Sequence, residues 1–348
     1  MNEGITFQER IAATLSEQSS LSLAVWGAAV VLGVISLGYA AVDRPGLVID
    51  NLIGGFVYGM ILVLIALGLA LILGLMNVVN FAHGALFMAG AYIAYHVVAV
   101  LGLSFWVALV VAPLAVGVVG ILMEVLVLRR VYGQEPIVGL LATFGMTLMF
   151  QEAVRAIWGS TPLRFDTPAL LDGPLSLGVT SVGKFRLFAV AVSVIAVVAT
   201  YLIVTRTTFG LSVRSGVQDP EMSEFLGINI PLRFTAMFFL GATIAGLGGV
   251  LRGAEVGMQP DLGASFIILT FIVVVVGGVG SLFGSVVAGL LIGEAVFLFP
   301  LMIRAMADLT GLEFLAIRGI GGLVPYLVMI VILMVRPRGF FGTEGFLE

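Results

Sequence analysis

About ten apolar runs follow one another along the chain, most of them close to the roughly 20 residues that a helix needs to cross a bilayer. Their approximate limits are 21–42, 50–75, 78–100, 103–127, 136–158, 185–205, 233–252, 262–276, 284–300 and 319–335. The chain has 348 residues, 60% hydrophobic and only 10% charged, and its mean hydropathy of +1.19 is out of reach for a water-soluble domain. The sequence therefore predicts an all-α fold, a polytopic transmembrane helical bundle. We expect this bundle at 21–335, between a cytoplasmic or interfacial segment at 1–20 and a cytoplasmic tail at 336–348.

Close helix packing is predicted by the glycines, which number 45. Three pairs of glycines are spaced four residues apart, as in small-xxx-small packing motifs: Gly55/Gly59, Gly280/Gly284 and Gly289/Gly293. Glycine is also common in any membrane bundle, so each pair has this plainer explanation beside the packing role.

The polar loop at 206–232 contains a short predicted helix. Asp219 can cap its start, Pro220 suits the first helical position, and Gly227 supplies a stop. Three apolar side chains then share one face, at i, i+3 and i+4: Met222, Phe225 and Leu226. A helix of only about 10 Å is marginal alone. We therefore interpret it as an element that docks on a partner.

The arginines give the orientation. Ten spans put both termini on one side, and the cytoplasmic side collects the clustered basic residues, as the positive-inside rule prefers. These are Arg129, Arg130, Arg206, Arg214, Arg233, Arg336 and Arg338. The loop at 159–184 would then lie outside the cell, where a soluble protein could contact it.

Two stretches interrupt the apolar runs, one in each half of the chain. The first contains Asn77, Asn80, His83 and Gly84. The second contains Gly278, Gly280 and Ser281. Paired breaks of this kind indicate a transport pathway at membrane depth. The alternative is that each break is a capped helix end at the membrane surface.

Catalytic chemistry has little support in this sequence. His83 and His96 are the only histidines and there is no cysteine, so we expect no metal site and no cofactor. No convincing set of nucleophile, base and orienting group is evident. The stretch 178–184 matches the phosphate-loop spacing GxxxxGK, but Phe185 replaces the residue that holds magnesium. No basic patch with interleaved aromatic residues suggests nucleic acid. We expect neither an enzyme nor a nucleotide-binding site of its own.

Acidic residues within or beside the spans leave a different class of function open. Glu152 can pair with Arg155 on one helical face, and Glu124 is close enough to Arg129 to reach the surface with it. In an ion-coupled secondary transporter, Glu255 or Glu294 would be the titrating carboxylate.

Four motifs, in order, resemble the permease subunits of ABC importers for branched-chain amino acids, a family that includes urea and short-chain amide permeases. They are VNFAHGALFMAGAY (79–92), DPEMSEFLGIN (219–229), VVGGVGSLFGSVVAGLLIG (275–293) and MVRPRGFFG (334–342), and the similarity runs from about 51 to 342. Ala85 stands where the family often has an acidic residue, and the first apolar run precedes the start of shorter members.

The resemblance implies partners and site residues. The partners are two ATP-binding cassette subunits, a second homologous permease, an extracytoplasmic solute-binding protein and the lipid bilayer of the plasma (bacterial inner) membrane. The cytoplasmic loop of such permeases carries an EAA pattern with a later glycine, and Glu221 and Gly227 keep that spacing. The resemblance thus implies an ATPase-coupling surface made of Asp219, Glu221, Met222, Phe225, Leu226 and Gly227. The solute would most closely fit a branched-chain amino acid, with urea, short-chain amides or aromatic acids as alternatives.

Overall fold

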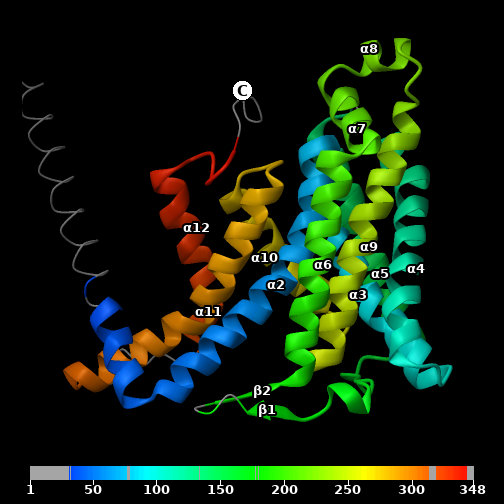
Figure 1. Ribbon diagram of the computed structural model, residues 1–348. Helices are drawn as coiled ribbons and strands as arrows, with labels where there is room; N and C mark the ends of the chain where they lie inside the picture. Colours follow the sequence, from blue (N-terminus) through cyan, green and yellow to red (C-terminus); the bar gives the residue numbers. More distant parts are fainter. Residues whose placement is uncertain are drawn as a thin grey trace, which may run out of the picture.

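The computed structural model describes residues 31, 33–76, 79–132, 134–176, 178, 180–312 and 319–342. Helices dominate this part of the chain (Figure 1). In order they are an apolar helix Gly33–Asp43, α2 (Pro45–Met76), α3 (His83–Tyr95), α4 (Phe105–Leu126), α5 (Pro136–Trp158), α6 (Lys184–Arg206), α7 (Thr208–Gln218), α8 (Pro220–Phe225), α9 (Ile230–Val256), α10 (Leu262–Gly277), α11 (Leu282–Thr310) and α12 (Val324–Val335). A π-helical turn, His96–Val100, extends α3. The all-α prediction is confirmed.

Seven of the described helices are long and apolar enough to cross a membrane. These segments are Pro45–Gly74, His83–Val100, Phe105–Arg130, Ile137–Trp158, Lys184–Arg206, Ile230–Val256 and Leu282–Thr310. Three shorter apolar helices, Gly33–Asp43, Leu262–Gly277 and Val324–Val335, match three further predicted runs. Much of the first run, 21–42, lies outside the described residues. The chain is thus a multi-span membrane protein, and the count of about ten spans stays a prediction.

The core is built on α9, which packs against α2, α3 and α4. Glycines make the close approach possible: a Cβ atom added to Gly249 would lie 1.8 Å from the Phe87 carbonyl oxygen of α3. Helices α2 and α11 pack in the same way. A Cβ atom on Gly293 would lie 2.4 Å from Gly59 Cα and 2.6 Å from the Gly55 carbonyl oxygen. The predicted packing role of the pairs Gly55/Gly59 and Gly289/Gly293 is confirmed.

The two ends of the bundle differ (Figure 1). Helices α7 and α8 project from one end, and the described end of the chain beyond α12 lies toward that same end. A short antiparallel hairpin, β1 (Pro174–Ser176) and β2 (Ser181–Gly183), lies at the opposite end, with Leu175 paired to Val182. The hairpin was not predicted. Strand β2 covers 181–183 of the 178–184 stretch, and α6 begins directly after it, at Lys184.

Candidate functional site

Helix α8 has the predicted caps. The Asp219 carboxylate accepts a hydrogen bond from the Met222 N–H at 2.9 Å, and Pro220 opens the helix. At the other end Gly227 has φ +82°, a left-handed conformation that favours glycine. The Gly227 N–H donates to the Glu224 carbonyl at 2.9 Å and the Ile228 N–H donates to the Ser223 carbonyl at 3.1 Å. This is the Schellman pattern, which satisfies carbonyls that a helix end otherwise leaves free.

The apolar side chains of α8 point away from the bundle. Met222 is 55% exposed, Phe225 86% and Leu226 74%, whereas Ser223 on the other side is buried. We call these three apolar residues the α8 face. Glu221 is exposed beside it. Isolated exposed apolar residues are common, whereas here three neighbouring ones form one apolar patch at the tip of a capped projection.

Sequence reasoning missed α7, the helix that supports α8. Its buried side carries Gly210, Val213 and Gly216. A Cβ atom on Gly210 would lie 2.0 Å from the Val204 carbonyl oxygen of α6, and one on Gly216 would lie 2.4 Å from the Ile230 side chain of α9. The helical spacing of these residues was a usable signal, but two of the three are glycines, which add little hydropathy. Helix α7 is therefore packed tightly against α6 and α9, and it supports α8, which follows it directly.

The first interruption lies deep in the bundle. Asn77 falls outside the described residues, but Asn80 and His83 are both fully buried. The His83 Nε2 lies 3.0 Å from the Ile65 carbonyl oxygen of α2. Because a carbonyl only accepts, this ring nitrogen carries the proton and donates. Ile65 comes 11 residues before the end of α2, so α3 begins about 16 Å from that end, measured along α2.

Polar groups at this break are incompletely paired. The two amide atoms of Asn80 and the Nδ1 of His83 are buried without a hydrogen-bond partner. The backbone beside them is held by Thr143 of α5, whose hydroxyl accepts from the Phe81 N–H at 3.2 Å and lies 3.4 Å from the Val79 carbonyl. Irregular backbone inside a membrane protein needs such internal partners. Unpaired buried side-chain groups are costly, and they cluster where a protein binds or moves something.

The second interruption is the turn between α10 and α11. Gly278 and Gly280 have φ +97° and +81°, and the Ser281 hydroxyl caps α11 by accepting from the Gly284 N–H at 3.0 Å. The geometry is that of a capped helix end, the second of the two explanations left open by the sequence. The C-terminal segment covers this turn: the N–H groups of Phe340 and Phe341 donate to the carbonyls of Val276 and Gly277, at 2.8 and 3.0 Å. The motifs at 275–293 and 334–342 thus form one unit.

The structure does not bring the two interruptions together. A Cβ atom on Gly68 would lie 2.9 Å from the His83 ring, whereas one on Gly74 would lie 2.3 Å from Gly280. These two α2 glycines are six residues apart, or about 9 Å along the helix. The predicted neighbour Gly84 lies instead against Gly263, at the start of α10. Asn80, His83 and Gly84 thus form one group, and Gly278, Gly280 and Ser281 another. Their role in a pathway stays a prediction.

The expectation that Glu124 reaches the membrane surface was wrong. Its side chain is only 1% exposed, and its two carboxylate oxygens accept bonds from Arg129 at 3.1 and 3.0 Å. The Thr235 hydroxyl of α9 donates a further bond at 2.9 Å, so the carboxylate joins the end of α4 to the start of α9. Burial raises the pKa of the neighbouring Tyr132 hydroxyl, and the Glu124 charge raises it further, which keeps that phenol neutral.

The other acidic residues differ in how well they are paired. Glu152 forms the predicted ion pair with Arg155. The Glu255 carboxylate is bound by Arg252 at 2.8 Å and by Arg186 at 3.2 Å, so its charge is compensated twice. Glu294, at the α2–α11 contact beside Gly55, has one carboxylate oxygen buried without a partner.

Comparison with known proteins gives a consistent result. The family model described as "Branched-chain amino acid transport system / permease component" matches residues 51–333. The high-affinity branched-chain amino acid transport system permease protein BraD of Pseudomonas aeruginosa is 28% identical over 309 residues, covering 84% of this chain and 95% of BraD. LivH of Escherichia coli K12, also named a high-affinity branched-chain amino acid transport system permease protein, is 26% identical over 308 residues, with the same coverage. A probable LivH permease of Methanocaldococcus jannaschii is 28% identical, covering 84% of this chain and 91% of that protein. No solved structure matches.

Proposed function

The chain belongs to the family of branched-chain amino acid transport permease components, and from this premise we propose that it is the transmembrane permease subunit of a binding-protein-dependent ABC importer. Its solute is a branched-chain amino acid, as the names of BraD and LivH suggest. The subunit moves the solute inward across the bacterial inner membrane and does no chemistry on it. Separate subunits supply the energy of ATP hydrolysis.

The exposed α8 face is the observation that carries this proposal. A capped helix that presents Met222, Phe225 and Leu226 to the outside of the bundle leaves apolar surface uncovered in a permease that works alone. It suits a groove on an ATP-binding subunit, because an amphipathic helix docks by its apolar face. We assign the coupling surface to Asp219, Glu221 and Gly227 together with the α8 face.

A continuous packed route leads from α8 to the first interruption. Helix α8 contacts α7, and α7 packs against the ends of α6 and α9, as described above. The α9 glycines then approach α3 backbone to backbone: a Cβ atom on Gly249 would lie 1.8 Å from the Phe87 carbonyl oxygen, and one on Gly90 of α3 would lie 2.2 Å from the Gly246 carbonyl oxygen. Helix α3 begins at His83. Closely packed helices move as units, so a tilt of α8 would reach the buried group around Asn80 through α9.

This proposal also assigns each end of the bundle to one side of the membrane. The α8 end, with the tail at 336–342, is cytoplasmic; the segment at 1–20, also predicted to be cytoplasmic, lies outside the described residues. The β1–β2 hairpin end is extracytoplasmic and receives the solute-binding protein. A complete transporter contains a second homologous permease and two ATP-binding cassette subunits. We place the solute path beside Asn80 and His83, with Asn77 and Gly84 as predicted neighbours. Gly278, Gly280 and Ser281 were predicted for the same path, but they form the separate turn between α10 and α11.

Co-purification tests the proposal most directly. When this subunit is tagged and extracted gently from its membrane, an ATPase with a phosphate-loop motif should accompany it in nearly stoichiometric amount. Uptake into sealed vesicles should require ATP and the binding protein, and should survive a protonophore. Two results would replace this proposal with an ion-coupled transporter, for which Glu294 is the candidate carboxylate. One is solute accumulation by the purified subunit alone. The other is uptake that continues when ATP is depleted and is lost when an ionophore is added.

Substrate class and pathway need separate measurements. Competition by leucine, isoleucine and valine in assembled vesicles, compared with urea, short-chain amides and aromatic acids, identifies the solute. Alanine at Asn80 or His83 should lower uptake while the complex still assembles. Unchanged uptake in both variants would remove these residues from the pathway and leave the coupling role of α8 standing.

A further inference from the structure

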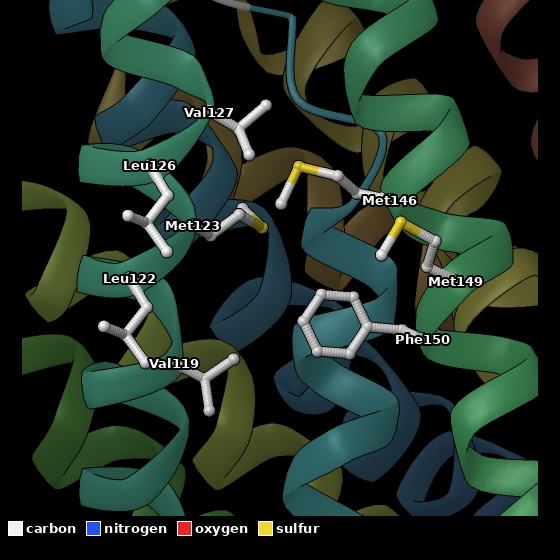
Figure 2. Close-up of a pocket in the computed structure, with 8 residues that line it drawn as sticks. All are labelled: Val119, Leu122, Met123, Leu126, Val127, Met146, Met149 and Phe150. Carbon is white, nitrogen blue, oxygen red and sulfur yellow. The ribbon is translucent and has the colours of Figure 1, made fainter.

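A narrow apolar groove separates α4 from α5 (Figure 2). Its volume is about 250 Å³. Side chains of the two helices border it, and all of them are apolar. They are Val119, Leu122, Met123, Leu126 and Val127 from α4 and the residue after it, and Met146, Met149 and Phe150 from α5. Both helices are candidate spans, so the groove lies within the bilayer and an apolar occupant is required.

The size of the groove distinguishes between occupants. Residues 119–127 extend about 12 Å along α4, at 1.5 Å per residue. A gap of this volume over this length is too small to admit a whole helix, about 10–12 Å across with its side chains, which would only rest on the rim. A single hydrocarbon chain fits, and flexible methionines at three of the eight lining positions adapt readily to such a chain.

Positive charge stands at one end of the groove. Val127 lines it, and the Arg130 N–H donates to the Val127 carbonyl at 3.1 Å, so Arg130 follows one short turn beyond. Arg129 is bound to Glu124 and to Thr235 at the start of α9, which places this end of the groove on the α8 side of the membrane. Among the described residues, Arg130 has an exposed side chain and no carboxylate partner.

We propose that this groove binds one anionic phospholipid of the α8-side leaflet, with an acyl chain between α4 and α5 and its phosphate at Arg130. The hydrocarbon chain fills a gap that water cannot occupy favourably. The phosphate of the headgroup supplies the negative charge that would pair with the Arg130 guanidinium. Juxtamembrane arginines are favoured by anionic lipid surfaces for this reason.

The bound chain also acts as a spacer for α5. Helix α5 carries Thr143, which holds the irregular backbone at 79–81 beside Asn80. In the described structure α5 packs mainly against α3, with smaller contacts to α10 and to the turn after α4. An acyl chain between α4 and α5 therefore sets the position of the helix that supports the first interruption. This consequence holds whatever solute the protein carries.

The headgroup part is tested by native mass spectrometry of the delipidated full-length protein. It is titrated with phosphatidylglycerol or phosphatidylcholine of identical acyl chains, and tight single-lipid binding is measured. We expect Arg130→Gln to weaken phosphatidylglycerol binding about fivefold, the effect of one cationic side chain near an anionic headgroup, and to remove the preference over phosphatidylcholine. The matched control is Arg206→Gln, which removes one exposed arginine from the same end of the bundle, on α6. Equal effects of the two substitutions would overturn the headgroup assignment.

The acyl-chain part is tested by filling the groove. Leu122→Trp adds bulk inside it, and Leu202→Trp adds the same bulk on the exposed side of α6, where the two leucines are 53% and 48% exposed. Leu122→Trp should abolish the tight binding of both lipids, whereas Leu202→Trp should leave it unchanged. Equal lipid retention in the two variants contradicts the proposal. Loss of a co-purifying permease subunit with lipid retention intact also contradicts it, because the occupant would then be a partner helix.

Discussion

Truncating Phe225 should uncouple the ATP-binding subunit without damaging the bundle. An aromatic side chain contributes about 150–250 Å² of surface, and 86% of the Phe225 surface is exposed. Docking could therefore bury about 130–215 Å² of it, worth about 3–5 kcal/mol at 25 cal/mol per Å². Alanine keeps part of that area, and ordering the side chain costs about 0.5–1.5 kcal/mol. We expect a loss of about 2–3 kcal/mol, or a dissociation constant raised about 30- to 150-fold.

The assay is titration of the purified ATPase onto the detergent-solubilised permease, followed by ATP-driven uptake in vesicles. Phe225→Ala should weaken binding and lower uptake, while thermal unfolding of the isolated subunit stays unchanged because the side chain contacts little in the bundle.

A pair of leucines supplies the control for this experiment. Leu226 on α8 and Leu170 near the β1–β2 hairpin are almost equally exposed, at 74% and 75%, but they lie at opposite ends of the molecule. Leu226→Ala should weaken ATPase binding and Leu170→Ala should not. Wild-type affinity in both Phe225→Ala and Leu226→Ala would refute the reasoning that α8 is the docking surface.

Three further substitutions test packing and capping. Gly249→Ala should destabilise the bundle by about 2–3 kcal/mol, because the new Cβ atom meets the backbone of α3 at 1.8 Å and overpacked sites cost this much. The control is Gly145→Ala, which should not destabilise the bundle because a Cβ atom there has no neighbour within 4 Å. Thermal unfolding of the two variants measures the difference. Glu124→Ala should lower the stability of the bundle by about 2–3 kcal/mol, because it breaks a buried ion pair whose arginine still reaches water. Glu152→Ala should lower it by less than about 1 kcal/mol in the same assay, because the Glu152 side chain is 66% exposed. Equal losses in the two variants would contradict the burial argument. Asp219→Ala should loosen α8 by about 1 kcal/mol, visible as faster hydrogen exchange at 220–227 with unfolding of the whole bundle unchanged.

Local signals made α8 predictable. Its cap, its proline, its terminal glycine and its apolar triad all act within nine residues, so the sequence contained every contact that sets its ends. The apolar runs were equally readable, because each span must satisfy its own backbone inside the bilayer. Helix α7 was missed because its buried face consists mostly of small residues, which give a weak hydropathy signal.

The second interruption shows the limit of pattern reading. Paired breaks predicted one shared site, but Gly278 and Gly280 form a turn closed by Phe340 and Phe341, more than 50 residues later in the chain. Asn80 and His83 lie elsewhere, deep beside α2. The spacing of two breaks in the sequence does not show whether they lie at the same depth in the membrane or in contact with each other.

By itself, the sequence determined the membrane class, the approximate spans, the close packing of two glycine pairs, and the capped helix at 219–227 with its apolar face. These features depend on hydropathy, residue size and short-range hydrogen bonds. The tertiary structure alone decided the burial of Glu124 against α9, the depth at which α3 begins, the support of α8 by α7, and the groove between α4 and α5. Each of these depends on where helices distant in the chain approach one another, because packing geometry fixes which polar groups are enclosed and which gaps remain.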